Sequence, residues 1–305
     1  MTNKLVARFS LNTLAIFSLV GVAFGYAVLG MNSRLLSQGF EPSTQVYVRI
    51  LIGFGLSLIV FGRQLRLKQM LATSKQDMFW LVFMGVVGYA GAVLFATLAA
   101  LNAKLVNVSV IGATVPFVVY AYSYFLLREK IKPTLVLNLL VALYGVTIVA
   151  SKSFLPNLES FGMGEVFAVL SVLAAGWWSI SRKMLSNHLN NSEITVSTML
   201  IAGVASLIVA VLQGEPLPIQ AFTLPSVLVG IGIGAGLNLG LTFLEMFAFK
   251  HIDLVFGNQL LMISTVFSLF GGILLYQEYV SGAELVGGLL ILGTVWQANR
   301  YVENT

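Results

Sequence analysis

The strongest constraint on the fold of this chain is internal repetition at a constant offset of 149 residues. Both copies are almost wholly apolar. Tandem copies of an apolar unit are typical of membrane transporters, in which two copies of one helical bundle rock against each other around a site between them. We therefore expect two related halves, residues 1–152 and 153–305. The offset pairs these identical residues without a gap: Ser37 with Ser186, Gly85 with Gly234, Gly91 with Gly240, Ala99 with Ala248, Val106 with Val255, Leu126 with Leu275, and Glu129 with Glu278.

The composition excludes a soluble domain. Hydrophobic residues make up 58% of the chain, charged residues only 10%, and the mean hydropathy is +0.91. A soluble domain carries roughly 25% charged residues, so lipid must surround most of this surface. The net charge of +5 comes from short connectors between apolar runs and does not indicate nucleic-acid binding. There is no cysteine, and His188 and His251 are the only histidines. We therefore expect no disulfide, no metal site and no cofactor.

Ten apolar runs are long enough to be membrane-spanning helices. A hydrocarbon core roughly 30 Å thick requires about 20 apolar residues per helix. Strand-like alternation is absent, so the spans are predicted to be helical. The first run follows Lys4 and Arg8, and we interpret it as an uncleaved helix rather than a signal peptide. The predicted fold class is all-α and integral to the membrane, with spans near 11–32, 43–62, 78–99, 106–127, 134–151, 163–182, 194–212, 225–248, 254–275 and 282–299.

The Lys and Arg residues predict the orientation. With the amino terminus in the cytoplasm, the outer side holds only Arg34, Lys104 and Lys152. Cytoplasmic loops carry the excess of Lys and Arg, so both termini are expected in the cytoplasm of a multi-pass protein of the cell membrane (the inner membrane in a bacterium). The thirteen residues of the inner side are Lys4, Arg8, Arg63, Arg66, Lys68, Lys75, Arg128, Lys130, Lys132, Arg182, Lys183, Lys250 and Arg300.

Five spans per copy is an odd number, so the second copy is expected to cross the membrane in the opposite sense. The charges agree with this inversion. The turn 128–130 (Arg-Glu-Lys) is cationic, whereas its counterpart 277–279 (Gln-Glu-Tyr) has lost both cations. We therefore predict two inverted-topology repeats of five helices each.

At this level of detail the sequence resembles the drug/metabolite transporter superfamily, and within it the EamA-type transporters of five plus five helices. Segments 99–151 and 248–297 each resemble the family unit of a helix, a short turn, a helix with a mid-span proline, a "GE" turn and a closing helix. Segment 174–185 (AAGWWSISRKML) resembles the opening helix of a repeat. There are two departures: Thr265 stands where Pro116 predicts a second proline, and Arg128 and Gln277 replace the turn glycine.

The resemblance implies a secondary transporter of small polar or amphipathic solutes, often directed outward. An amino-acid or amine exporter working by alternating access is the leading interpretation. An importer of organic cations and a phosphate-sugar or nucleotide-sugar exchanger are the alternatives. The exchanger is less favoured because Arg49 is the only cation within a span. A coupling proton or Na⁺, and the oligomeric state, with a monomer among the choices, stay open.

A membrane enzyme or receptor is a weaker alternative in a different class. No HExxH, Walker lysine loop or GxSxG motif occurs in the sequence, so we predict no enzymatic activity. No ATP-binding module occurs either, so transport would use a gradient or run downhill.

Two charged residues within spans are the first candidates for a substrate site. A charge in the bilayer costs several kcal/mol and requires a partner or a water-filled cavity. Arg49 would bind a carboxylate; alternatively it snorkels or binds carbonyls at the end of a neighbouring helix. Glu245 would bind an ammonium or carry a coupling proton; alternatively it pairs with Lys250 or Lys183 near the interface. If both face one cavity, they would suit a zwitterion.

Uncharged polar and aromatic residues supply the remaining candidates. Tyr89 is the repeat counterpart of Asn238, so both are expected in one cavity. Most aromatic residues are expected in packing or interfacial belts. Adjacent tryptophans on a helix point about 100° apart, so at most one of the pair at 177 and 178 faces a central cavity. The complete set of candidates is Arg49, Glu245, Tyr89, Asn238, Asn258, Gln259, Trp177, Trp178 and Tyr26.

Glycine and proline add two local predictions. The glycines at 230, 232, 234, 236 and 240 are typical of a close-packing helix surface. Pro116 is expected to bend its helix and free a carbonyl near Gly112.

Overall fold

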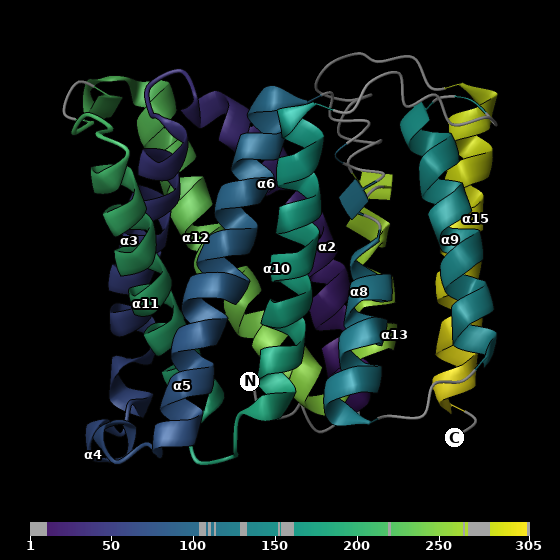
Figure 1. The fold of residues 1–305 in the computed structure, drawn as a ribbon, viewed down its shortest axis with the longest axis horizontal. Helices are drawn as coiled ribbons and strands as arrows, with labels where there is room; N and C mark the ends of the chain where they lie inside the picture. The colour runs from purple at the N-terminus through teal and green to yellow at the C-terminus, as the bar shows by residue number, and fades with distance from the viewer. Residues whose placement is uncertain are drawn as a thin grey trace, which may run out of the picture.

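The described part of the chain is a bundle of helices, and no described residue lies in a strand (Figure 1). The computed structural model describes residues 11–103, 108, 111–112, 114–128, 133–151, 153, 162–218, 221–264, 266–267 and 281–303. Several residues discussed above lie outside these ranges. They are Lys4, Arg8, Lys104, Val106, Glu129, Lys130, Lys132, Lys152, Thr265, Leu275, Gln277, Glu278 and Tyr279.

The elements of the first half follow the apolar runs. They are α2 (Leu11–Leu36), α3 (Pro42–Phe61), the 3₁₀ turn η1 (Gly62–Gln64), α4 (Leu67–Leu71), α5 (Lys75–Phe83), the π-helical segment η2 (Met84–Ala90), α6 (Gly91–Asn102), α8 (Val115–Tyr122), the π-helical segment η3 (Ser123–Leu127) and α9 (Pro133–Ser151).

The elements of the second half are α10 (Met163–Met184), α11 (Asn191–Leu212), the 3₁₀ turn η4 (Ala221–Thr223), α12 (Pro225–His251), α13 (Leu254–Leu261) and α15 (Gly282–Glu303). In the described residues of both halves, six helices are long and apolar enough to cross a membrane, and three shorter apolar helices accompany them. Large apolar side chains such as Ile59 and Leu212, each 81% exposed, cover the outer surface, as lipid contact requires. The predicted count of ten spans stays a prediction, because residues 268–275 of the ninth span are outside the described ranges.

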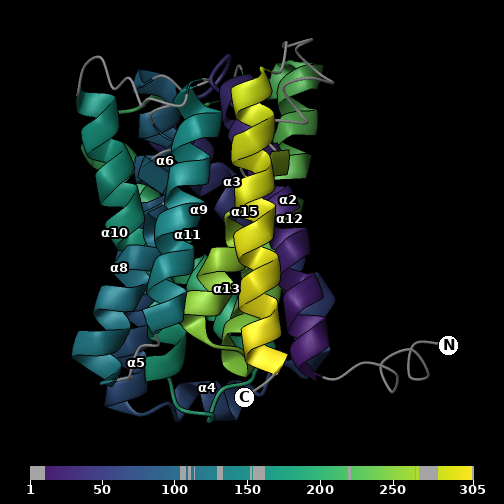
Figure 2. The ribbon, with the colours of Figure 1, turned by 90° about the vertical axis from the view of Figure 1, so that its right-hand side faces the viewer.

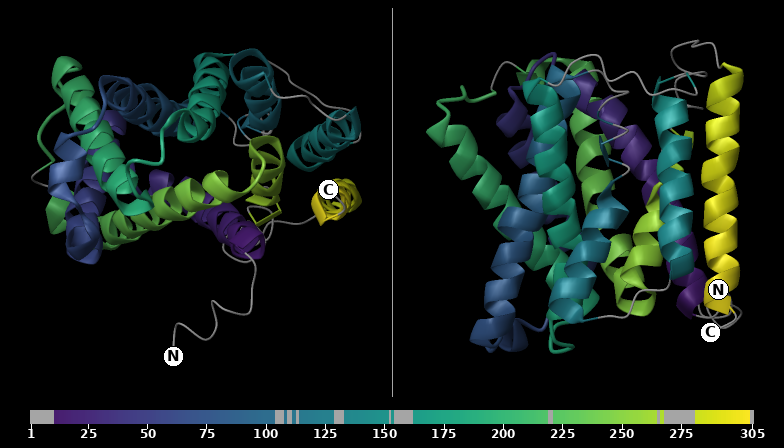
Figure 3. Two further views of the ribbon diagram at one scale, coloured as in Figure 1. Left: turned by 90° about the horizontal axis from the view of Figure 1, so that it is seen from below. Right: turned by 45° about the vertical axis from the view of Figure 1, so that its right-hand side comes forward.

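The principal helix contacts join the two halves. Helix α2 packs along α12, α6 along α10, and α3 along α11. Helices α9 and α15 pack on each other at one edge of the bundle, as Figure 1 and Figure 3 show. Helix α2 begins and α15 ends at the same end of the bundle, where α4 also lies (Figure 2). Adding 149 to the residue numbers of α2 and α6 gives α10 and α12, so the contact between α2 and α12 corresponds to the contact between α10 and α6. In the same way α3 corresponds to α11.

Close packing between halves depends on particular glycines. A Cβ on Gly88 would lie 3.0 Å from the backbone nitrogen and Cα of Trp178, so α10 approaches the π-helical segment η2 at a distance that only glycine permits. In α12, Gly230 and Gly234 meet side chains of α2 and α3. Of the five glycines predicted to form a close-packing surface on α12, only Gly230 and Gly234 therefore pack against other helices. A Cβ at residues 232, 236 or 240 would meet nothing within 4 Å, because these glycines lie on the other side of the helix.

Two local features differ from the sequence predictions. Pro116 lies in the first turn of α8 rather than mid-helix, a position where its missing N–H costs no helical bond. Arg128 ends η3 with φ 55° and ψ 30°, the left-handed conformation that glycine adopts without strain. The resemblance expects glycine at this turn, and the backbone explains that preference.

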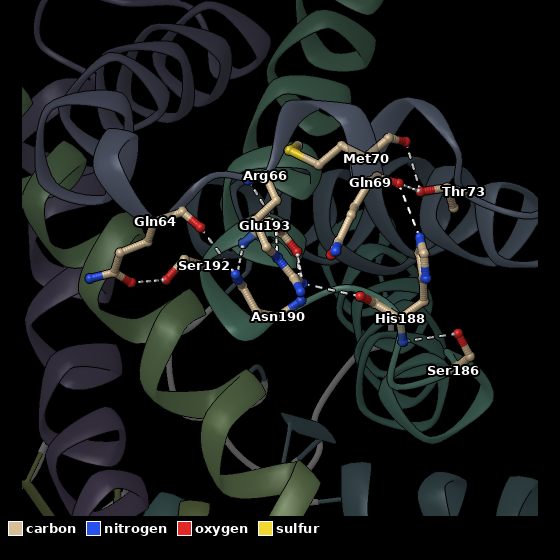
Figure 4. A network of polar contacts seen from close by, with 10 residues as sticks. All are labelled: Gln64, Arg66, Gln69, Met70, Thr73, Ser186, His188, Asn190, Ser192 and Glu193. Carbon is tan, nitrogen blue, oxygen red and sulfur yellow. Dashed lines mark hydrogen bonds and ion pairs between the residues drawn. The ribbon is translucent and has the colours of Figure 1, made fainter.

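At one end of the bundle, the end of α3 is joined to the start of α11. The Glu193 carboxylate accepts hydrogen bonds from Arg66 through its backbone nitrogen (2.9 Å), Nε (2.8 Å) and Nη2 (2.7 Å). These hydrogen bonds raise the pKa of Arg66 above its ordinary value. The Ser192 hydroxyl donates to Gln64 Oε1 at 2.8 Å (Figure 4). We call Gln64, Arg66, Ser192 and Glu193 the first rim cluster.

At the other end, the start of α3 is joined to the end of α11. The Glu215 carboxylate accepts from the backbone nitrogens of Ser43 (3.0 Å) and Thr44 (2.6 Å) and from Thr44 Oγ1 (2.7 Å). The Ser43 hydroxyl donates to Gln213 Oε1 at 2.6 Å. We call Ser43, Thr44, Gln213 and Glu215 the second rim cluster. The offset of 149 residues maps each of its members onto a member of the first rim cluster, and the hydroxyl–glutamine hydrogen bond recurs at both ends.

Glu215 acts as an N-cap supplied from another helix, because it satisfies two N–H groups at the start of α3. Replacement of Glu215 with alanine is expected to destabilise the protein by about 1–2 kcal/mol. This loss should lower the midpoint of thermal unfolding in detergent by a few degrees. The matched control is Glu41→Ala, because the Glu41 side chain makes no capping bond to the same helix. Equal midpoints for the two variants would contradict the capping role.

Candidate functional site

A cavity of about 370 Å³ lies among α2, α3, α6, α8, α10, α12 and α13. Its volume is in the range of small-molecule sites. Its wall combines a few polar groups with small apolar side chains. Seven of the nine candidates from the sequence lie in this wall: Tyr26, Arg49, Tyr89, Trp178, Asn238, Glu245 and Asn258.

Glu245 is held by two neutral donors. Its Oε2 accepts a hydrogen bond from the Tyr26 hydroxyl at 2.7 Å and another from Trp178 Nε1 at 2.8 Å. The residue is 2% exposed, and among the described residues no side chain or backbone group donates to Oε1. The carboxylate is therefore oriented through one oxygen, and the other oxygen is left for a ligand in the cavity. The alternative pairing with Lys183 or Lys250 is not made in the structure.

Arg49 is held by two hydroxyl groups. Its Nη1 donates to Ser33 Oγ at 3.0 Å and its Nη2 donates to Thr97 Oγ1 at 3.1 Å. Each hydroxyl also donates to the carbonyl four residues earlier, Ser33 to Leu29 and Thr97 to Val93, which leaves its lone pairs for the guanidinium. Arg49 is 3% exposed, and its Nε has no partner among the described residues. The guanidinium neither snorkels nor binds helix-end carbonyls in the described part of the chain.

The two charges do not neutralise each other. Within the described residues, the only ion pair with nitrogen and oxygen within 4.0 Å is that of Arg66 and Glu193 at the rim. Arg49 and Glu245 thus stand in the wall of one cavity, each oriented by neutral groups and neither compensated by a counter-ion from the described residues. A buried charge without a counter-ion favours a ligand of opposite charge.

Tyr89 and Asn238, which the offset of 149 residues pairs with each other, are hydrogen-bonded. The Tyr89 hydroxyl donates to Asn238 Oδ1 at 2.7 Å, and Asn238 Nδ2 donates to the carbonyl of Gly234 at 2.6 Å. The two residues are 149 positions apart, so the offset maps this pair onto itself. The Tyr89 ring also lies 4.8 Å, centroid to centroid, from the indole of Trp178. This contact joins the Tyr89–Asn238 pair to Trp178, whose indole donates to Glu245.

Asn258 joins the wall through Ser179, whose hydroxyl donates to Asn258 Oδ1 at 3.1 Å. Two candidates are outside the wall. Trp177 packs on the rings of Phe83 and Tyr122, with centroids 5.0 and 4.7 Å away, and thus faces away from the cavity. Gln259 is fully buried, and its amide has no hydrogen-bond partner among the described residues.

Sequence reasoning missed the small hydroxyl residues of the site. Ser33, Thr97, Ser179 and Thr242 all line the cavity. Serine and threonine within a membrane helix usually donate to a carbonyl of the preceding turn, so their positions carry no distinct signal. For Ser179 and Thr242 the one available signal was their position within four residues of Trp178, Asn238 or Glu245; Ser33 and Thr97 had no such neighbour.

A multi-span helical membrane protein with a cavity at the contact between its halves has an architecture typical of membrane transporters. The sequence profile of the EamA-like transporter family matches the chain twice, over residues 13–151 and 162–299. The chain belongs to this family and is a membrane transporter of the drug/metabolite transporter superfamily.

The relatives of this chain agree with that assignment. It is 25% identical over 275 residues to the pseudopaline exporter CntI of Pseudomonas aeruginosa, covering 88% of this chain and 90% of the relative. It is also 25% identical over 274 residues to the uncharacterized transporter YoaV of Bacillus subtilis, covering 89% and 91%. A solved crystal structure superimposes with a TM-score of 0.73 at 17% identity, covering 95% of this chain and 98% of the other, which shows a shared fold.

Proposed function

We propose that this protein is a secondary transporter that exports zwitterionic metabolites of the amino-acid class by alternating access. The moving parts are two inverted five-helix repeats, residues 1–152 and 153–305. The exchange of the rim clusters by the 149-residue offset supports this division, and so do the two separate matches of the family profile. The described residues that line the cavity all belong to one chain, which supports a monomer as the transporting unit.

The observation that carries the substrate class is the pair of uncompensated charges in the cavity wall. Arg49 presents a guanidinium, which suits a carboxylate. Glu245 presents a free carboxylate oxygen beside the Trp178 and Tyr26 rings, which suits an ammonium group. A ligand with both groups would compensate both protein charges at once, whereas an amine or an acid would leave one of them buried and unpaired.

The rest of the wall constrains the side chain of the substrate. Besides the two charged residues, the lining includes Leu29, Ala92, Val93, Ala96 and Leu241. These small and medium apolar groups suit an amino acid with an apolar side chain. A nucleotide-sugar is disfavoured, because a single guanidinium does not match a diphosphate.

Three supporting arguments concern direction and coupling. Export accords with the name of the relative CntI, and the excess of Lys and Arg assigns the first rim cluster to the cytoplasmic face. Glu245 is the buried carboxylate available to carry a coupling proton when no substrate is bound. Na⁺ coupling would require an oxygen cluster, for which the carboxylate and the amides of Asn238 and Asn258 are the available ligands.

Three probes that differ by one charged group test the substrate class. Leucine has both charges, isoamylamine lacks the carboxylate, and 4-methylpentanoate lacks the ammonium. We expect leucine to raise the midpoint of thermal unfolding in detergent at millimolar concentration, because it binds only the folded protein. The other two should have little effect. Leucine should also exchange across proteoliposome membranes.

The two other outcomes are equally informative. Stabilisation by isoamylamine alone would replace the proposal with amine transport through Glu245 and Trp178, and would leave Arg49 with a structural role. No effect of leucine at any concentration up to tens of millimolar would contradict the zwitterion proposal.

A further inference from the structure

The cavity is one-sided with respect to the repeat. In one region of the cavity, both members of an offset pair line the wall: Tyr89 with Asn238, Val93 with Thr242, and Ala96 with Glu245. Further toward the second rim cluster, only one member of each pair does so. Ser33, Arg49 and Thr97 line the cavity, whereas their counterparts Arg182, Thr198 and Met246 are no more than 3% exposed and do not line it.

Arg182 is the charged member of these three counterparts; we call their side of the cavity the closed side, and the side of Ser33, Arg49 and Thr97 the open side. Its guanidinium is buried, at 3% exposure, yet Nε and Nη2 have no hydrogen-bond partner among the described residues. Leaving buried donors unpaired costs free energy, and the cost is larger for a charged group. The buried position of Arg182 is therefore energetically unfavourable in this conformation. Its Nε and Nη2 groups are able to donate hydrogen bonds in another conformation.

The offset explains which group Arg182 would bind. It maps Ser33 onto Arg182 and Arg49 onto Thr198, so the hydrogen-bonded pair on the open side corresponds to an arginine and a hydroxyl on the closed side. In the first half the arginine lies on the second helix (Arg49 on α3), whereas in the second half it lies on the first helix (Arg182 on α10). The counterpart bond is not made here, because Thr198 Oγ1 is also buried without a partner among the described residues.

We infer that Arg182 and Thr198 form a second anion-binding position, which opens toward the first rim cluster when the access of the cavity reverses. It would take the carboxylate of the substrate after Arg49 releases it. This inference rests on the alternating access proposed above and adds a named residue pair for the opposite state. The ligand class is a carboxylate, as it is at Arg49.

The absence of cysteine from the chain permits a test that needs no substrate. Thr198→Cys is reconstituted in vesicles and treated from each face with an anionic and a cationic membrane-impermeant methanethiosulfonate. We expect reaction from the face of the first rim cluster, faster with the anionic reagent. Adding Arg182→Gln should lower the ratio of anionic to cationic rates about tenfold, which corresponds to about 1.4 kcal/mol.

Matched variants separate this inference from the proposed transport cycle. Lys183→Gln removes the neighbouring exposed cation and should change the ratio less than about twofold. Arg182→Lys retains the charge and should keep the anionic preference, which covers the case in which Arg182→Gln does not fold. An unchanged ratio in Arg182→Gln would overturn the anion site alone. Reaction of Ser33→Cys from the opposite face, with none of Thr198→Cys from either face, would overturn alternating access as well.

Discussion

Replacement of Glu245 with glutamine is expected to abolish transport while leaving a folded protein. Glutamine keeps the size of the side chain and one oxygen acceptor for the Tyr26 hydroxyl and the Trp178 indole. The variant loses the negative charge that would compensate the substrate ammonium. Removing one partner of a buried charge pair costs about 2–5 kcal/mol, so leucine should bind roughly 30-fold more weakly or worse.

The measurement is leucine exchange in proteoliposomes, with folding checked by size-exclusion chromatography and by the midpoint of thermal unfolding without ligand. Glu41→Gln is the matched control, because Glu41 is an exposed carboxylate at the start of α3 and makes no capping bond. It should transport at the level of the unmodified protein. Unchanged leucine exchange in Glu245→Gln would remove Glu245 from the site.

Replacement of Arg49 with glutamine is expected to change which probes bind rather than only how tightly. The guanidinium is the cation in the cavity wall, so its loss removes the compensation of a carboxylate and also the penalty for a ligand that lacks one. Leucine should lose at least about tenfold in affinity, because a charged hydrogen bond contributes about 1.5–3 kcal/mol. Isoamylamine should bind as well as before or better.

The ratio of leucine to isoamylamine affinity distinguishes binding from structure. A structural role for Arg49, holding α2 and α6 together through Ser33 and Thr97, predicts equal losses for both probes and a lower unfolding midpoint. Ser33→Ala tests that role directly, because it removes one support and leaves the guanidinium in place. It should destabilise the protein by about 1 kcal/mol and keep the preference for leucine.

The positions of the helices were predictable because the bilayer fixes how many apolar residues a span needs. Every apolar run of the sequence contains described helix, although residues 268–275 of the ninth run lie outside the described part. The presence of Tyr89 and Asn238 in one cavity was predicted from the 149-residue offset, whereas the hydrogen bond between them was not. Neither inference required a homologous sequence.

The partners of the charges were not predictable. Glu245 precedes Lys250 by five positions, which suggested an ion pair at the interface, but Lys250 is exposed and the carboxylate turns into the cavity. Its partners, Tyr26 and Trp178, lie 219 and 67 residues away in sequence. Sequence separations of this size are bridged only by the packing of α2 and α10 against α12, which an apolar pattern does not specify.

The two rim clusters have a consequence for how the repeats move. Both are formed in one structure whose cavity is one-sided, so a cavity displaced to one side is compatible with both clusters being intact. Together they fasten α3 to α11 at both ends. In the alternating access that we propose, a change of access that keeps these bonds would move α2, α6, α10 and α12 relative to the α3–α11 pair. The α3–α11 pair then stays fixed while the other four helices move around it. Its contacts contribute the same free energy to the state open on one side and to the state open on the other.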